Sequence, residues 1–343
     1  MSALAADRGA APRAARGGAA SRAPRPLLGV DGMAALGAVL LWSTNALAAN
    51  LALGALTVYQ LLSLQFVAAT VALAAFRAHR SRGAGSRAAL RLRDLPVAIV
   101  GLTGTIFLQY LAFASAPIVE ANILAYAWPL FVAVWAAVAH RGRHTLIGVL
   151  LAVIGFAGVV LIFAGGGAVA AGGGQTAGYL AALGSAGCMA FYTATVSRTR
   201  TSAHDLLLAA TTAGAVVAFV LAQAQGAPWP GAAAWAAAVY IGLGPMAAGF
   251  LLWTTAMSGS HDGRCATVTT GDSDNRCAGS GDHISGTGSR RLAPLGYATP
   301  LLSTGLLVAA GEAFTRDTLL GATLVAVCTL GVLVADYLRR RRP

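Results

Sequence analysis

The sequence contains no lysine and only two glutamates, and charged residues make up just 10% of its 343 residues. Without lysine there can be no Walker-type phosphate loop. The HExxH and GxSxG motifs are also absent, so neither a zincin nor an α/β-hydrolase is indicated. With 57% hydrophobic residues and a mean hydropathy of +0.69, the chain lacks the polar surface of a water-soluble globule. These absences predict a polytopic membrane protein and not an enzyme.

Ten apolar segments are long enough to cross a bilayer when the chain is read with a window of about 19 residues. They cover approximately residues 33–53, 57–76, 95–114, 118–138, 145–164, 177–196, 205–224, 234–257, 292–310 and 318–336. We number these predicted spans 1 to 10 in chain order. The expected fold is an all-α integral membrane protein with ten transmembrane helices.

All 24 basic residues are arginine, and their distribution predicts the orientation of the chain. If the chain crosses the membrane ten times, 23 of the 24 arginines lie on the same side of the membrane, and Arg316 is the exception. Positively charged loops stay in the cytoplasm, so both termini are expected there, in a bacterial inner membrane. The net charge of +12 therefore reflects topology, and we expect no nucleic-acid partner.

An internal repeat divides the chain into two halves. The segment Tyr126-Ala127-Trp128-Pro129-Leu130 of span 4 returns as Tyr297-Ala298-Thr299-Pro300-Leu301 of span 9, and Gly101-Leu102 of span 3 matches Gly242-Leu243 of span 8. Because each half has an odd number of spans, the second enters the membrane with opposite orientation. This predicts two inverted five-helix repeats, the organisation of many secondary transporters.

The predicted segments follow from the repeat. They are a disordered cytoplasmic tail (1–30), a first repeat (31–164), a Gly-rich linker (165–176), a second repeat (177–336) and a basic cytoplasmic tail (337–343). The Arg-rich start also resembles an organelle transit peptide, although glycine and proline interrupt any amphipathic helix there.

An insertion at about 260–287 separates spans 8 and 9, and its composition differs from the rest of the chain. It contains zinc-type ligands, His261, Cys265, Cys277 and His283, but their spacing matches no zinc motif and few apolar residues surround them. We therefore expect no metal and no other cofactor. The four cysteines form no disulfide framework, and free thiols are expected.

Polar and aromatic residues at membrane depth are costly, so they are the candidates for substrate binding. Spans 4 and 9 each carry a proline, which leaves a backbone carbonyl free. Two such helices in matching positions are typical of a transport site; two structural kinks are the alternative. Packing between helices is the alternative for the polar residues of span 1. The candidates are Trp42, Asn45, Tyr110, Tyr126, Trp128, Pro129, Tyr192, Tyr297, Pro300 and Ser303.

The two glutamates, Glu120 and Glu312, are candidates for ion coupling. Each falls close to the outer end of a predicted span. Solvation of a carboxylate is cheap at such a position, which argues against a coupling role.

These motifs resemble the EamA type of the drug/metabolite transporter superfamily over residues 33–336. The resemblance rests on Leu40-Leu41-Trp42-Ser43, on the repeated Tyr-Ala-x-Pro-Leu segment and on Gly311-Glu312. Within the superfamily, Glu120 to Trp135 is similar to the aromatic amino-acid exporters, which implies a central cavity lined by Tyr126 and Trp128, with Tyr110 nearby. Gln65 stands where the family often has arginine.

The expected function is export of a small organic metabolite, such as an amino acid, by alternating access. One alternative is a passive facilitator or channel of the same fold. A second is a membrane scaffold or receptor that uses the 260–287 loop. The expected partners are the substrate and the lipid bilayer, and the sequence leaves a homo-oligomer open.

Overall fold

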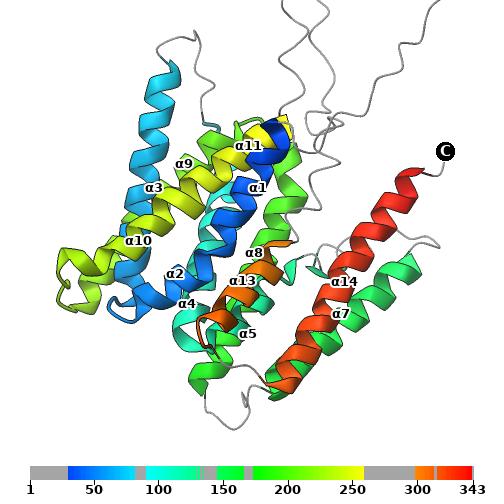
Figure 1. Ribbon diagram of the computed structural model, residues 1–343. Coiled ribbons are helices and arrows are strands. Elements are labelled where there is room, and N and C mark those ends of the chain that lie inside the picture. Colours follow the sequence, from blue (N-terminus) through cyan, green and yellow to red (C-terminus); the bar gives the residue numbers. More distant parts are fainter. Residues whose placement is uncertain are drawn as a thin grey trace, which may run out of the picture.

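The computed structural model describes residues 30–81, 90–128, 130–131, 134, 145–165, 173–258, 298–312 and 315–341. This part of the chain is helical and contains no β-strand. The helices run up and down a single bundle (Figure 1). In the first half they are α1 (Val30–Ser43), α2 (Asn45–Leu53), α3 (Val58–Ser81), α4 (Gly104–Ser115), α5 (Ile118–Ala125) and α7 (Thr145–Gly165). In the second half they are α8 (Gly173–Thr195), α9 (Ala203–Gln225), α10 (Ala236–Ile241), α11 (Phe250–Ser258), α13 (Ala298–Ala309) and α14 (Arg316–Arg341).

Five helical stretches are long and apolar enough to cross a membrane. They are Gly32–Leu53, Val58–His79, Leu92–Ser115, Ala203–Gln225 and Ala232–Ala256. Each overlaps a predicted span, so the protein is a multi-pass membrane protein. The other predicted spans contain α5, α7, α8, α13 and α14. The predicted insertion lies outside the described residues, as do the tail at 1–29 and linker residues 166–172.

Glycine lets several helices approach one another closely, as is common between helices in membranes. A Cβ atom built on Gly158 of α7 would lie 2.6 Å from the carbonyl oxygen of Gly321 of α14. The reverse distance, from a Cβ on Gly321 to the oxygen of Gly158, is also 2.6 Å. Gly155 faces Cys328 in the same way, so the two helices are antiparallel. This pair stands at one edge of the bundle (Figure 1).

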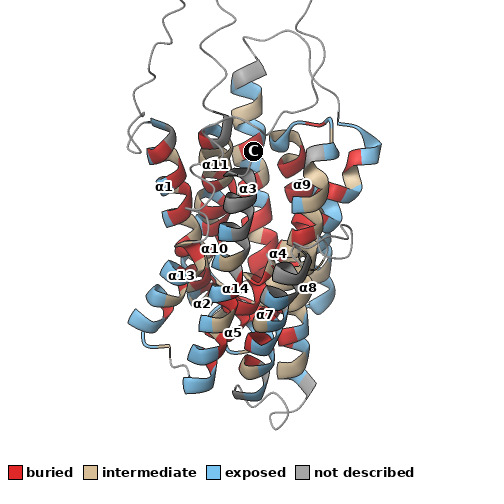
Figure 2. Cartoon of the chain, turned by 90° about the vertical axis from the view of Figure 1, so that its right-hand side faces the viewer, coloured by how far each residue is buried: buried red, intermediate tan, exposed pale blue. Residues whose placement is uncertain are grey.

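The buried residues gather along the centre of the bundle, while the outer helix faces are exposed (Figure 2). Many of the exposed side chains are large and apolar, such as Val71, Val160 and Phe219. In water such surfaces would be unfavourable, but they suit contact with lipid chains. The polar residues buried at the centre are therefore those that need an explanation.

Several predicted spans are interrupted helices. Span 1 is divided at Thr44, where the hydroxyls of Ser43 and Thr44 donate to the carbonyls of Val39 and Leu41 at 2.7 and 2.8 Å. Spans 3 and 8 contain π-helical segments, η2 (Val97–Thr103) and η5 (Gly242–Gly249). These segments hold the two Gly-Leu pairs of the sequence repeat. π-Helical turns are frequent at functional sites.

Candidate substrate site

Trp42 of α1 binds the π-helical segment of span 8. Its indole nitrogen donates to the carbonyl of Pro245 at 2.9 Å, and its ring lies 5.3 Å from each of the rings of Phe250 and Trp253. Gly249 makes this contact possible, because a Cβ there would lie 2.7 Å from the indole nitrogen. The predicted aromatic residue of span 1 is thus held against span 8 by both a hydrogen bond and ring packing.

Asn45 and Tyr110 join span 1 to span 3. The phenol of Tyr110 donates to the Asn45 side-chain oxygen at 2.7 Å, and Tyr110 is buried. Both residues were predicted from the sequence as candidates, and the structure brings them into direct contact.

Asn122 and Ser303 join span 4 to span 9. The amide of Asn122 donates to the Ser303 hydroxyl at 3.2 Å, and both side chains are buried. Ser303 was predicted, whereas Asn122 was missed. The available signal was an amide inside an apolar span, one turn before Tyr126.

The helix of span 4 ends just before the predicted aromatic pair. α5 stops at Ala125, and Tyr126 and Ala127 form a turn. Proline at position 129 has no N–H to offer the Ala125 carbonyl, four residues earlier, which agrees with a helix that ends there. Tyr126 and Trp128 are half-buried. The interruption occurs where the repeated motif predicts it.

Gln65 and Thr299 are fully buried, and their side-chain polar atoms have no hydrogen-bond partner among the described residues. Neither amide atom of Gln65 in α3 is bonded, and the hydroxyl of Thr299 in α13 is also unbonded. Gln65 is 0% and Thr299 1% exposed. Buried polar groups are nearly always paired, so each unpaired one points to a partner that the described chain does not supply.

The two glutamates each tie the halves of the chain together. Glu120 accepts hydrogen bonds from Tyr179 of α8 and, at 2.8 Å, from Thr318 of α14. Glu312 accepts one from the Asn50 amide at 2.6 Å. Glu120 is only 4% exposed, so the expectation that this carboxylate would be cheaply solvated was wrong. The flanking helices α8 and α14 cover it, a contact that residue spacing does not reveal.

The remaining predicted residues lie elsewhere or outside the described part. Tyr192 of α8 is half-buried at a different junction, against Gly101 of η2, where an added Cβ would come within 2.9 Å of the Tyr192 Cβ. Pro300 is half-buried in the first described turn of α13. Pro129 and Tyr297 lie outside the described residues, so their predicted roles stay predictions.

Helices α1 and α2 connect these contacts. They pack against α4, α5, η5, α10, α11 and α13, so bonded pairs from spans 1, 3, 4, 8 and 9 lie around one interrupted helix. In the described part of the chain no basic side chain is buried. The centre therefore offers amides, hydroxyls, an indole and phenols, with no cationic group among its described residues.

Comparison with known proteins agrees with this architecture. The model of the EamA-like transporter family matches residues 32–164. The aromatic amino acid exporter YddG of Ancylobacter novellus is 33% identical over 312 residues, covering 89% of this chain and 96% of that protein. The chain belongs to the EamA-like transporter family. A solved crystal structure with 26% identity has a TM-score of 0.57 and covers 91% of this chain and 99% of its own.

Membership of the EamA-like family supports a metabolite transporter and not an enzyme. It also agrees with the resemblance read from the sequence motifs. The residues that sequence reasoning missed, Asn122, Tyr179 and Thr318, all act across helix junctions, where only the packed structure pairs them.

Proposed function

We propose that this EamA-like protein exports an amino acid, an aromatic one first of all, across the bacterial inner membrane by alternating access. The observation that carries the proposal is the set of three bonded pairs around α1 and α2: Trp42 with Pro245, Asn45 with Tyr110, and Asn122 with Ser303. Alternating access needs contacts that bridge elements able to move apart, and these pairs bridge five predicted spans. The similarity to an aromatic amino acid exporter supports the choice of substrate.

The chemistry of the site suits a zwitterion with an apolar side chain. Neutral amides and hydroxyls can bind the ammonium and carboxylate of such a ligand, while aromatic faces attract rings or cations by about 0.5 to 2 kcal/mol per contact. Because no basic side chain is buried in the described chain, a ligand with a large net negative charge would lack a counter-charge. A net-neutral amino acid needs none.

Ten spans in two inverted repeats are part of the proposal. The antiparallel packing of α7 and α14, the last helices of the two halves, supports it. So do the matching π-helical segments η2 and η5. The first turn of α1, the end of α3 and the end of α14, which adjoin arginine-rich segments of the sequence, lie toward one end of the bundle (Figure 1). By the positive-inside rule this end faces the cytoplasm.

The test of this function is efflux of labelled phenylalanine, tryptophan and leucine from proteoliposomes. We expect saturable efflux that falls at least tenfold in Trp128→Ala. Trp229→Ala is the matched control, because Trp229 is also half-buried but lies in the loop between α9 and α10, where it bonds Gln223. Wild-type kinetics in Trp128→Ala would move the site elsewhere, and equal loss in both variants would indicate damage to the fold.

Glu120 is the favoured coupling residue within this proposal. It is buried, its oxygens are held by neutral hydroxyls, and no ion pair joins it to any described residue. A chain of hydrogen bonds leads from the exposed Thr315 through Thr318 to its carboxylate. Buried acidic groups with such access often carry protons in transporters.

The coupling test uses Glu120→Gln, with Glu312→Gln as the matched control. Efflux driven by an imposed proton gradient should disappear in Glu120→Gln while exchange of substrate for substrate persists. Gradient-driven efflux that survives in Glu120→Gln would exclude coupling at this residue. Insensitivity of the unmodified protein to proton and sodium gradients would favour the passive facilitator instead.

A further inference from the structure

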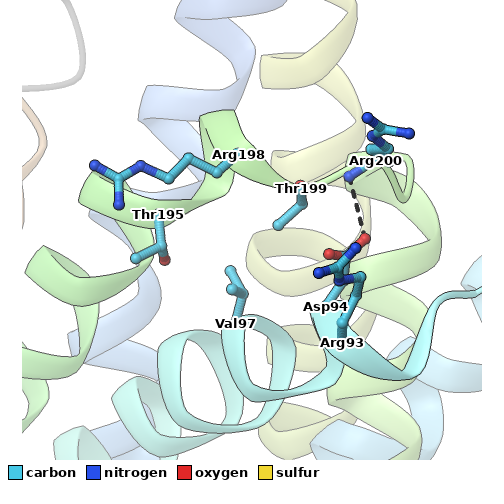
Figure 3. A pocket seen from close by; sticks show the side chains of 7 residues that line it. All are labelled: Arg93, Asp94, Val97, Thr195, Arg198, Thr199 and Arg200. Atoms are coloured by element: carbon cyan, nitrogen blue, oxygen red, sulfur yellow. Dashed lines mark hydrogen bonds between the residues drawn. The ribbon is translucent and has the colours of Figure 1, made fainter.

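A cavity of about 360 Å³ is lined by residues of arginine-rich segments, none of which belongs to the site described above (Figure 3). It lies between the start of span 3 and the segment that connects α8 to α9. Arg93 and Asp94 line it on one side, and Thr195, Arg198, Thr199 and Arg200 on the other. Its volume falls within the range of small-molecule pockets.

Asp94 carries the only carboxylate among the described residues that line this cavity, and its hydrogen bonds come from neutral donors. One oxygen of Asp94 accepts hydrogen bonds from the backbone N–H groups of Arg200 and Thr201 at 3.1 and 3.0 Å, and from the Thr201 hydroxyl at 2.7 Å. Asp94 thereby fixes the connecting segment against span 3. It forms no ion pair with an arginine of the cavity among the described residues.

The three arginines therefore leave an excess of positive charge. Arg93, Arg198 and Arg200 are exposed, and none has an ion-pair partner in the described part of the chain. In Figure 3 Arg198 and Arg200 extend to opposite sides of the cavity, while Arg93 lies beside Asp94. Free side chains of this length can turn toward an anion without repacking the protein, and guanidinium groups bind phosphate in bidentate fashion.

The threonine hydroxyls of the cavity already donate their protons to backbone carbonyls. The Thr195 hydroxyl donates to the Phe191 carbonyl and the Thr199 hydroxyl to the Val196 carbonyl, each at 2.7 Å. Their protons are thus already used within their own chain segment. Binding of an anion would depend on the arginines.

Exposed apolar side chains continue from the cavity along span 3. Leu92 is 82% exposed, and Ile99 and Val100 are about half exposed. A lipid has a phosphate at the depth of the membrane surface and acyl chains directly below it, which matches a basic cavity beside an apolar helix face. Basic pockets between membrane helices on the cytoplasmic side bind anionic headgroups.

We propose that the cavity formed by Arg93, Arg198 and Arg200 binds the phosphate headgroup of an anionic membrane lipid. The bound phosphate bridges span 3 to the segment between α8 and α9, beside the hydrogen bonds that Asp94 accepts. This site is independent of the transported substrate, so its test does not depend on transport.

The test is native mass spectrometry of the purified full-length protein titrated with phosphatidylglycerol or phosphatidylcholine. The site variant is Arg93→Gln/Arg198→Gln. The control is Arg91→Gln/Arg316→Gln, which removes the same charge from two exposed arginines outside the cavity. We expect saturable phosphatidylglycerol adducts in the unmodified and control proteins, at least fivefold weaker binding in the site variant, and no such preference for phosphatidylcholine.

Two results would overturn the proposal. Equal phosphatidylglycerol binding by the site and control variants would show that general surface charge, and not this cavity, attracts the lipid. Binding of soluble glycerol phosphate as tight as that of phosphatidylglycerol, and equally dependent on the arginines, would assign the cavity to a soluble phosphate ligand. A thermal unfolding scan of each variant without lipid confirms that the proteins compared are folded.

Discussion

The side-chain amide of Asn122 donates a hydrogen bond to the hydroxyl of Ser303 at 3.2 Å, between helices 181 residues apart in sequence. Both side chains are 1% exposed, so neither has water as an alternative partner. The bond joins the second half of α5, which leads to Tyr126 and Trp128, to α13. The bond therefore joins two residues that flank the copies of the repeated motif in the sequence.

Replacing Asn122 by alanine should lower stability and transport together. Hydrogen bonds between membrane helices average about 0.6 kcal/mol and reach about 1.7 kcal/mol, and the buried Ser303 hydroxyl would lose its partner. A double-mutant cycle compares Asn122→Ala, Ser303→Ala and the double variant with the unmodified protein. The unfolding free energies of the four proteins in detergent give the coupling energy of the two side chains. Strictly additive effects of the two substitutions would contradict a direct bond.

Gly249→Ala should abolish transport, because the added methyl group would lie 2.7 Å from the Trp42 indole nitrogen and break its bond to the Pro245 carbonyl. Gly244→Ala is the control in the same π-helical segment, since its Cβ would lie 3.4 Å from the nearest side-chain atom, an ordinary contact. Efflux assays and near-ultraviolet fluorescence of tryptophan compare the two. Equal activity of both variants would show that Trp42 tolerates displacement.

Gly158→Ala should destabilise the packing of α7 on α14 by about 1 to 3 kcal/mol, because the new Cβ would meet the Gly321 carbonyl oxygen at 2.6 Å and overpacking costs this much. Gly187→Ala in α8 meets nothing within 4 Å. There alanine should stabilise the helix by about 0.5 to 1 kcal/mol. Unfolding in mixed micelles measures both, and a loss of stability in Gly187→Ala would contradict the open space beside it.

Gln65→Leu should leave the protein as stable or make it more stable, while transport falls. The amide of Gln65 is buried without a partner in the described chain, and removing such a group relieves a cost of about 1 to 3 kcal/mol. Unchanged transport in this variant would exclude Gln65 from the substrate path.

Gln60→Leu, five residues earlier in the same helix, should behave in the opposite way. The Gln60 amide donates to the carbonyls of Ala227 and Pro228 at 3.2 and 3.1 Å and accepts from the Thr57 N–H. Its loss leaves these groups unpaired, so a decrease of about 1 to 3 kcal/mol in the unfolding free energy is expected. Thermal unfolding of the two glutamine variants side by side separates the two roles.

Local residue patterns determined the membrane class, the helical class and the family. Hydropathy over about 19 residues is a local property, and it found each of the five stretches that can cross a membrane. The repeated Tyr-Ala-x-Pro-Leu motif indicated where the helix of span 4 would end, because a proline withholds an N–H from a carbonyl only four residues away. Trp42, Asn45, Tyr110 and Ser303 were found as polar or aromatic side chains in apolar surroundings.

Only the tertiary structure decided which of these residues contact one another and which are buried. Asn122, Tyr179 and Thr318 gave weak signals, since an amide, a phenol or a hydroxyl near a helix end is common in membrane proteins. Glu120 was expected to be solvated near a span end, yet α8 and α14 cover it. Burial and bonding at such a position depend on helices far away in sequence. One span's sequence specifies its own apolar faces, but the partner of each polar group is set by the packing of all of them.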